Sequence, residues 1–311
     1  MRLLFLFLDG VGLGVNDPEI NPFSRAKTPF LESLLGGKHL IADAAPYTGS
    51  RASLLSLDAC LGVSGVPQSA TGQATLLTGK NVPAALGYHY GPKPNHLVAN
   101  FLQNGNIFNE LHNHGKSAAL LNAYPRRYFE GISSGKRLYS AIPLAVTSAG
   151  IALKTEVDLY NGNAIAADLT AQGWRDMLHM PDTPVITPFQ AGERLASIST
   201  DYDLAFFEYW LSDYAGHHQD MIQALALLES FDTMLSGLLS IWNDEDGLIL
   251  ITSDHGNLED LTTRRHTLNP VPAIIIGNPD HRAQFSAGLS SLSDIAPAIT
   301  RLIIPQGENC A

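Results

Sequence analysis

The chain has 311 residues, of which 45% are hydrophobic and 16% are charged. This composition supports a large buried core and excludes an intrinsically disordered chain. The net charge of −11 leaves no general basic surface for a phosphate backbone, so we expect no nucleic-acid partner. The two cysteines, Cys60 and Cys310, are too few for a disulfide framework, which suits a reducing compartment.

The N-terminal segment begins with the apolar run 3–8, which follows Arg2 and stops at Asp9-Gly10. This run is shorter than the ~7–15 residues of a signal-peptide core, and no small-residue cleavage site follows it. It is also far shorter than the ~20 residues that span a bilayer, and we predict no spanning segment elsewhere in the sequence. We therefore expect a buried strand, a cytoplasmic protein and no membrane partner.

Further short apolar runs follow along the chain, each bounded by turn residues. They predict strands buried on both faces, as in a parallel sheet: 3–8, 118–122, 204–209, 248–252 and 272–276. Helices are predicted between them: 27–35, 69–79, 106–115 and 220–242. The last of these has apolar residues at helical spacing and Asp220 as its N-cap. This alternation predicts an α/β fold, with a mostly parallel sheet and helices on both of its faces.

Residues 123–188 interrupt the alternation, because they are richer in Gly, Ser, Thr and Pro and lack a strong apolar strand. We predict that they form a small lid inserted into a catalytic core made of residues 1–122 and 189–311. The segment contains a basic cluster: Arg126, Arg127, Lys136 and Arg137. These side chains are candidate contacts for an anionic substrate, and a solvated surface is the alternative for each.

Aspartate and histidine residues follow the ends of three predicted strands. They are Asp9 after 3–8, Asp213 and His217 after 204–209, and Asp254 and His255 after 248–252, with His266 further along the chain. Each pattern alone is typical of a turn or of a polar helix pair. In open α/β sheets, however, ligands bind at the carboxyl ends of strands, so these side chains converge on one edge. Carboxylate and imidazole suit Zn²⁺, Mn²⁺ or Fe²⁺, and two such sets suit a pair of ions about 3.5–4 Å apart.

Two other segments bear on the chemistry. The glycine-rich run 9–14 lacks the G-x-G-x-x-G spacing, and the residues after it, with Pro18 and Pro22, cannot open the helix that a dinucleotide site needs. The segment 66–79 reads as a loop entering a helix, with Ser69 at the N-terminus, where backbone N–H groups favour a phosphate. Ser69 is then a candidate nucleophile or a helix cap, and Thr71 competes for the chemical role.

Taken together, these motifs resemble the alkaline phosphatase superfamily, in the metalloenzyme branch that includes cofactor-independent phosphoglycerate mutase and phosphopentomutase. The resemblance covers about residues 3–80 and 203–277. Five segments carry it in the same order: DGVG at 9–12, NPFSRAKTP at 21–29, DYAGH at 213–217, SDHGN at 253–257 and HTLNPVP at 266–272.

The resemblance implies specific roles for these residues. The distance to Gly79 implies that Ser69, and not Thr71, is the nucleophile. One metal ion, Mn²⁺ or Zn²⁺, would be held by Asp9, Asp254, His255 and the Ser69 oxygen, and a second by Asp213, His217 and His266. The ions would bind the phosphate oxygens, lower the pKa of Ser69 and offset the charge on the transferring group. A phosphoserine intermediate would pass the group to water or to a second hydroxyl.

Several positions depart from the pattern. Gln73 stands where the mutases usually have histidine, and Ala70 where phosphoglycerate mutases have an acidic residue. The intervening segment is shorter than the phosphoglycerate mutase insert and lacks its R-x-D-R run. Thr71 and Gln73 also disfavour a sulfatase. We therefore predict a phosphatase or phosphomutase for a small phosphorylated metabolite, with monoester hydrolysis ahead of mutase activity. A phosphodiesterase and an inactive metal-binding interaction domain are the alternatives.

Overall fold

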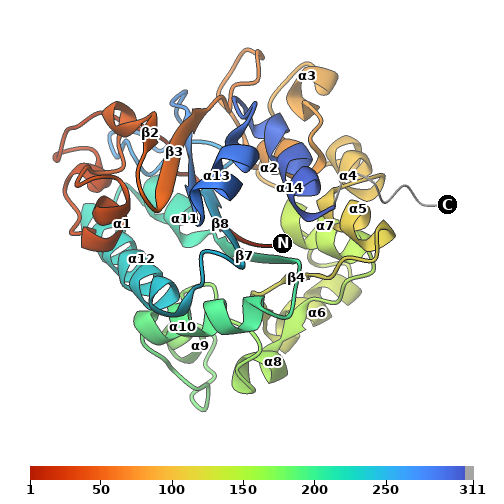
Figure 1. Ribbon diagram of the computed structural model, residues 1–311. Coiled ribbons are helices and arrows are strands. Elements are labelled where there is room, and N and C mark those ends of the chain that lie inside the picture. Colours follow the sequence, from red (N-terminus) through yellow and green to blue (C-terminus); the bar gives the residue numbers. More distant parts are fainter. Residues whose placement is uncertain (305–311) are drawn as a thin grey trace.

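The computed structural model describes residues 1–304, so Cys310 lies outside the described residues. A seven-stranded sheet in the order β2-β3-β9-β8-β1-β7-β4 forms the centre of the molecule. Its strands are β1 (Arg2–Leu8), β2 (Tyr47–Thr48), β3 (Ala52–Leu57), β4 (Ala118–Leu120), β7 (Leu204–Tyr209), β8 (Gly247–Thr252) and β9 (Val271–Ile276). Helices cover both faces of this sheet, as Figure 1 shows. The predicted α/β fold is confirmed.

The directions of the strands divide the sheet into two parts. Strands β8, β1, β7 and β4 are parallel to one another. Strand β9 runs antiparallel to β8, and β3 runs antiparallel to β9. The prediction that residues 272–276 belong to the parallel set is therefore wrong. The apolar run reflects burial on both faces, and burial on both faces does not fix a strand's direction.

Alternate side chains of the central strands enter two separate cores. In β1, Phe5 and Phe7 face one core, whereas Leu4 and Leu6 face the other. The first core is covered by α2 (Ser69–Thr78), α4 (His96–Gln103), α5 (Ile107–Asn113), α7 (Ala141–Ser148), α13 (Pro279–Ser286) and α14 (Ile295–Ile303). The second is covered by α1 (Pro29–Leu34), α10 (Pro188–Ser199), α11 (Leu211–His218) and α12 (Met221–Ile241). All four predicted helices are present.

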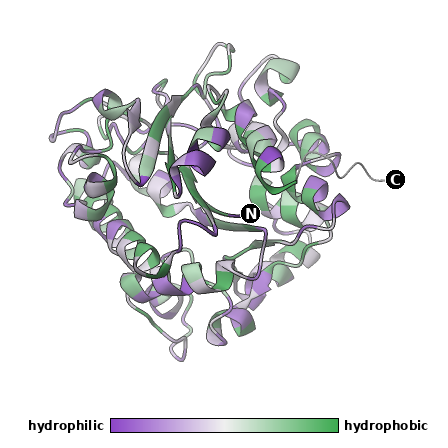
Figure 2. Cartoon of the chain, in the orientation of Figure 1, coloured by the Kyte–Doolittle hydropathy of each residue, from purple (hydrophilic) through white to green (hydrophobic). Residues whose placement is uncertain are grey.

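Helix α12 is long and apolar enough, by length and composition, to cross a membrane. The prediction that no segment qualifies is therefore wrong for this helix. It packs along α10, and Leu228, Met234 and Leu235 are buried in the second core, as in a core helix of a water-soluble protein. Figure 2 shows hydrophobic residues concentrated on the central strands, whereas the surrounding helices mix hydrophobic and hydrophilic residues.

Residues 123–188 contain short elements: β5 (Ala123–Tyr124), α6 (Arg126–Ser133), α7, β6 (Lys154–Thr155), α8 (Glu156–Tyr160) and α9 (Gln172–Asp176). Strands β5 and β6 form a separate parallel pair, beside a small apolar cluster that includes Leu159 and Trp174. Helix α7, in contrast, packs against α2 and α4 in the first core. The division of the chain into a lid and a core stays a prediction.

The topology brings distant segments to one edge of the sheet. Strands β8, β1 and β7 are adjacent and parallel, so their carboxyl ends lie side by side. Because β9 is antiparallel to β8, the connection 253–270 starts and ends at this edge. Strand β3 also ends here, since Leu57 pairs with Val271, and the chain then leads to α2. Short α3 (Val82–Leu86) follows α2.

Candidate metal centre

The strand ends deliver the predicted aspartate and histidine residues to one cluster. Asp9 directly follows β1, Asp213 lies in the first turn of α11 after β7, and His255 lies shortly after β8. One ligand atom from each of these three side chains lies within 4.8 Å of the others. The structure thus joins residues that are more than 200 positions apart in the sequence into one set of metal-ligating groups.

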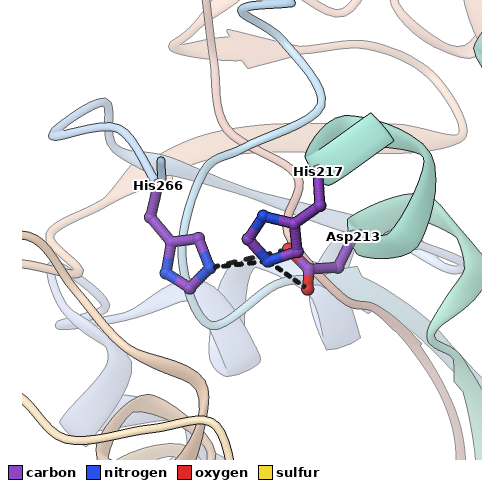
Figure 3. A group of neighbouring side chains, drawn as sticks. All are labelled: Asp213, His217 and His266. Carbon is purple, nitrogen blue, oxygen red and sulfur yellow. Dashed lines mark hydrogen bonds and ion pairs between the residues drawn. The ribbon is translucent and has the colours of Figure 1, made fainter. Parts of the chain in front are cut away.

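A second set shares Asp213 with the first and adds His217 and His266. His217 Nε2 lies 3.2 Å from Asp213 Oδ2, and His266 Nε2 lies 3.7 Å from Asp213 Oδ1. The two Nε2 atoms are 3.4 Å apart. Figure 3 shows Asp213 and His217 on one helix and His266 on a loop, with the three side chains pointing toward one another. The grouping of Asp213, His217 and His266 matches the one that the resemblance implies.

The remaining predicted ligands surround His255. Its Nε2 atom lies 3.0 Å from Ser69 Oγ, 3.5 Å from Asp9 Oδ1 and 3.6 Å from Asp254 Oδ2. Its ring stacks on that of His266, with centroids 3.7 Å apart. The structure therefore brings together all seven residues predicted as ligands.

Backbone carbonyls orient the three imidazole rings. His217 Nδ1 is 2.7 Å from the Arg264 carbonyl, and His266 Nδ1 is 2.8 Å from the Pro67 carbonyl. A neutral imidazole that donates from Nδ1 keeps its Nε2 lone pair for another partner. His255 Nδ1 has a longer contact, 3.4 Å, with the Gly256 carbonyl. These contacts leave all three Nε2 atoms facing the cluster, as is usual for metal-ligating histidines.

The carboxylates of the cluster, Asp9, Asp213 and Asp254, form ion pairs only with histidines within residues 1–304, and with no lysine or arginine. Burial, together with the neighbouring charges of Asp254 and Asp213, raises the pKa of Asp9 well above its ordinary value. Burial and the charge of Asp213 raise the pKa of Asp254 to about 7. Burial and the charge of His255 lower the pKa of His266 to about 4, which favours its neutral, metal-ligating form. Divalent cations fit this site, because they would supply the missing positive charge.

Unpartnered oxygen atoms support the same fit. Both carboxylate oxygens of Asp254 and Oδ1 of Asp9 are buried without a hydrogen-bond partner among residues 1–304. Buried carboxylates normally accept hydrogen bonds, or are paired or bound to metals. Asp213 differs: burial alone would raise its pKa, but hydrogen bonds from His217 and Asn257 and the charges of His255 and His217 hold it well below the ordinary value. The hydrogen bond to Asp213 raises the pKa of His217.

The two candidate nucleophiles have different surroundings. Ser69 is the first residue of α2, and its hydroxyl reaches the cluster through His255. The Thr71 hydroxyl instead contacts the carbonyls of Gln68 and Tyr90 and accepts a hydrogen bond from the Tyr90 N–H. Thr71 is fully buried and its hydroxyl serves the local backbone. The geometry therefore favours Ser69 for the chemical role.

A buried carboxylate that the sequence analysis did not identify connects three of the motifs. Glu259 Oε2 accepts hydrogen bonds from the backbone N–H groups of Gly12 (2.9 Å) and Asn257 (2.8 Å). Glu259 Oε1 accepts from the Thr267 hydroxyl and from Asn269 Nδ2. A Cβ atom at Gly12 or at Gly256 would collide with this carboxylate, which explains the glycine at both positions.

A cavity of about 530 Å³ opens beside the cluster, with Asp9, Ser69 and Asp213 among its lining residues. Basic and aromatic side chains form much of the wall: Lys93, Tyr124, Arg127, Tyr128, Arg137, Trp174 and Trp210. Arg127 and Arg137 were predicted, whereas Lys93 and the aromatic residues were not. Arg126 and Lys136 are not among the lining residues within the described chain. Arg126 points to solvent and pairs with Glu130, 2.9 Å away.

Comparisons with known proteins agree with this arrangement. The Metalloenzyme superfamily model matches residues 191–305. A 2,3-bisphosphoglycerate-independent phosphoglycerate mutase of Dinoroseobacter shibae is 34% identical over 145 residues, which cover 41% of this chain and 28% of the relative. The protein of the same name from Haloquadratum walsbyi is 35% identical over 113 residues, or 34% of this chain and 22% of the relative. The matches thus span about a quarter of the length of these curated relatives.

Solved structures extend the similarity over the whole fold. The PH0037 protein from Pyrococcus horikoshii has a TM-score of 0.59 at 16% identity, covering 97% of this chain and 96% of its own. The lipoteichoic acid synthase LtaP from Listeria monocytogenes has a TM-score of 0.52 at 9% identity, covering 97% of this chain and 71% of its own. The family match and the named relatives confirm the resemblance predicted from the motifs: this chain is similar to the Metalloenzyme superfamily over residues 191–305.

Proposed function

We propose that this protein is a metal-dependent phosphoryl-transfer enzyme that acts on a small phosphorylated metabolite through a phosphoserine at Ser69. The observation that carries the proposal is the position of Ser69. Its hydroxyl lies at the N-terminus of α2, lines the cavity and is 3.0 Å from His255 Nε2, within the cluster of predicted metal ligands.

Two divalent ions, Mn²⁺ or Zn²⁺, are the proposed cofactors. One would be held by Asp9, Asp254, His255 and Ser69, and the other by Asp213, His217 and His266. When bound, such ions lower the pKa of a serine hydroxyl and offset the negative charge on a transferring phosphoryl group.

The chain's own residues position the phosphate ester. Ser69 Oγ loses its proton to solvent and forms a bond to phosphorus, while the bond from phosphorus to the ester oxygen breaks and that oxygen takes a proton from water. The helix dipole of α2 favours an anion at this N-terminus. Lys93, Arg127 and Arg137 line the same cavity and supply positive charge for the phosphate oxygens.

The second step decides the class of enzyme. Attack of water on the phosphoserine restores Ser69 and releases phosphate, which makes the protein a phosphatase. Attack by a second hydroxyl of the substrate makes it a phosphomutase, the activity for which the relatives are named. We place hydrolysis first, because Gln73 and Ala70 depart from the mutase pattern. A phosphodiesterase is the next alternative, and an inactive metal-binding interaction domain is the last.

The decisive experiment follows phosphorus by ³¹P NMR. Purified protein with Mn²⁺ or Zn²⁺ is incubated with phosphomonoesters and phosphodiesters, so that both release and migration of phosphate are detected. We expect turnover of at least one monoester, and phosphate on the peptide that contains Ser69 after acid quenching. Absence of turnover with every ester would leave the inactive interaction domain as the better explanation.

Two hydroxyl variants form a matched pair. Ser69→Ala should abolish turnover, because it removes the nucleophile. Thr71→Val should retain turnover, although it lowers thermal stability, because the Thr71 hydroxyl bonds only to local backbone groups. Equal activity of Ser69→Ala and the wild type would contradict the proposal. We further expect a cytoplasmic location, with no nucleic-acid or membrane partner.

A further inference from the structure

A buried carboxylate outside the predicted metal ligands faces the cavity. Glu208 is the only charged residue in strand β7, whose sequence is LAFFEY, and it lies one position before the end of the strand. Its side chain is only 7% exposed, yet it lines the cavity with Ser69 and Asp9. A carboxylate in an apolar strand is costly to bury unless it has a partner.

Within residues 1–304, no side chain or backbone group donates a hydrogen bond to the Glu208 carboxylate. The hydrogen bonds of this residue all involve its backbone: Glu208 N–H donates to Asn122 Oδ1 at 2.7 Å, and its carbonyl accepts from Asn122 Nδ2 at 2.8 Å. Asn122 is also buried and uses its amide oxygen and its amide nitrogen in this pair. The backbone of Glu208 is therefore held firmly while its carboxylate stays free for a ligand.

The rest of the cavity wall defines the ligand further. Three basic residues, Lys93, Arg127 and Arg137, line the cavity together with three carboxylates, Glu208, Asp9 and Asp213. Because Asp9 and Asp213 belong to the proposed metal centre, Glu208 is the one remaining carboxylate among these lining residues, and the wall around it favours an anion over a cationic group. Tyr124, Trp174 and Trp210 add aromatic surface, which suits the apolar C–H face of a sugar or of a short carbon chain. A neutral group that donates a hydrogen bond satisfies Glu208 without opposing the basic residues.

We infer that the cavity selects phosphomonoesters of sugars or polyols, and that Glu208 is the specificity-determining residue that accepts a hydrogen bond from a substrate hydroxyl. The inference rests on the proposed function, since the same ester must present its phosphate to Ser69. It predicts that a substrate with a carboxylate in place of the hydroxyl is disfavoured, because two carboxylates would then meet in a buried site.

Four esters with a three-carbon chain test this inference: propyl phosphate, sn-glycerol 3-phosphate, 3-aminopropyl phosphate and 3-(phosphonooxy)propanoate. They differ in the group offered to Glu208: none, hydroxyl, ammonium or carboxylate. We expect kcat/KM for glycerol 3-phosphate to exceed that for each of the other three by about 10-fold or more, as for a hydrogen bond to a charged group. Release and migration of phosphate are both followed by ³¹P NMR.

Variants at Glu208 show whether this residue is the cause. Glu208→Gln keeps one acceptor oxygen and Glu208→Leu keeps none, so the ratio of kcat/KM for glycerol 3-phosphate to that for propyl phosphate should fall in that order and reach about one in Glu208→Leu. The inference concerns this ratio and not the absolute rate. Glu19→Gln, at an exposed position, is the matched control and should keep the wild-type ratio.

Other outcomes have distinct meanings. Transfer from all four esters at similar rates would overturn this inference and leave the proposed function intact. Transfer from none of the four would also overturn the inference, and it would contradict the proposed function only if every other ester tested is inert as well. A preference for 3-aminopropyl phosphate would instead make Glu208 a binding site for cations. Loss of bound metal in both Glu208 variants would assign this carboxylate to the metal centre and would also overturn the inference.

Discussion

The burial of Glu208 has a consequence for stability as well as for recognition. Burial, and to a lesser extent the charge of Asp254, raises its pKa to about 7. Below about pH 4, an ordinary glutamate is protonated in the folded and unfolded states alike, and Glu208 then has no effect on the free energy of unfolding. Between its ordinary pKa of 4.5 and about pH 7, the unfolded state releases this proton while the folded state keeps it, so stability falls as the pH rises and levels off above about 7.

We therefore predict that metal-free Glu208→Gln unfolds at the same urea concentration as the metal-free wild type near pH 4. At pH 8 the variant should be more stable, by up to about 3 kcal/mol, because it removes the buried charge. Urea unfolding of both proteins across this pH range provides the measurement. Exposed Glu19→Gln should follow the wild type throughout, and a Glu208→Gln curve that also does so would show that Glu208 is solvated.

Glu259 acts on the site through the loops that it connects. Its carboxylate accepts from the backbone at Gly12 and Asn257 and from two side chains of the segment after His266. In Glu259→Gln, one of the two carboxylate oxygens becomes an NH₂ group, which faces hydrogen-bond donors and cannot accept from them. We predict a loss of about 10–100-fold in metal affinity, the usual effect of removing a group that supports metal ligands.

Competition with a chelating dye measures this affinity in Glu259→Gln and in Asp260→Asn. Asp260 is the adjacent residue in the same loop, and its carboxylate bonds only within an exposed turn around Thr262. The Asp260→Asn variant should therefore bind metal with wild-type affinity. If Glu259→Gln lowers thermal stability but binds metal as tightly as Asp260→Asn, then Glu259 stabilises the fold without positioning the ligands.

At the scale of elements, the sequence predicts most of the central layer and misses its outer part. The runs at 3–8 and 248–252 are long and apolar, and they are strands with almost the predicted bounds. Strand β3 is not predicted from the sequence, because its segment, ASLLSL, mixes serines with leucines and lies between turns. The antiparallel direction of β9 arises because the connection 253–270 starts and ends at the same edge of the sheet. The local composition of the strand carries no information about the path of that connection.

The site shows the same limit. Ligands such as Asp9 and His255 are predictable because each follows a strong strand or belongs to a recognisable motif. Lys93 and Trp174 come to the cavity from irregular or short segments, where spacing does not reveal which way a side chain points. Glu208 had a signal that could have been used: a charged residue within an otherwise apolar strand. Such a residue requires an explanation even before a structure exists.

The contact between α10 and α12 depends on glycine. A Cβ atom at Gly192 would collide with the backbone of Met234, and one at Gly237 would collide with the backbone of Phe189. The two helices lie side by side in Figure 1, and this contact holds α12 against the second core. The absence of both side chains is what permits so close an approach of the two backbones.

We predict that Gly192→Ala destabilises the protein by about 1–3 kcal/mol, because the added methyl group forces the helices apart. Ser197→Ala on the exposed face of the same helix is the control, and it should be neutral or slightly stabilising. Urea denaturation compares the two variants with the wild type. A neutral Gly192→Ala would mean that α10 can shift away from α12 at little cost.

For the whole molecule, charge is distributed unevenly. The chain carries a net charge of −11, and the predicted ligands include the buried carboxylates of Asp9 and Asp254 and the partly buried carboxylate of Asp213. Basic residues are few, yet Lys93, Arg127 and Arg137 meet at the cavity. These three cations can attract a small anion to the cavity of an otherwise acidic molecule. The negative charge of the ligand carboxylates then needs positive charge close by, and bound divalent cations would supply it.

Removal of the metal should therefore lower the stability of the whole fold. Bound ions stabilise a protein by about 3 kcal/mol per site at a hundredfold excess over Kd, so we predict that a chelator lowers Tm by at least several degrees and that Mn²⁺ or Zn²⁺ restores it.

Asp254→Asn should have opposite effects in the metal-free and the metal-bound states. The metal-free variant should melt above the metal-free wild type, because it lacks an unpartnered buried carboxylate. When metal is added, the Tm of Asp254→Asn should rise less than that of the wild type, and the variant should bind fewer ions. Scanning calorimetry and metal analysis test both effects, and an Asp254→Asn protein that matches the wild type in both states would remove Asp254 from the metal centre.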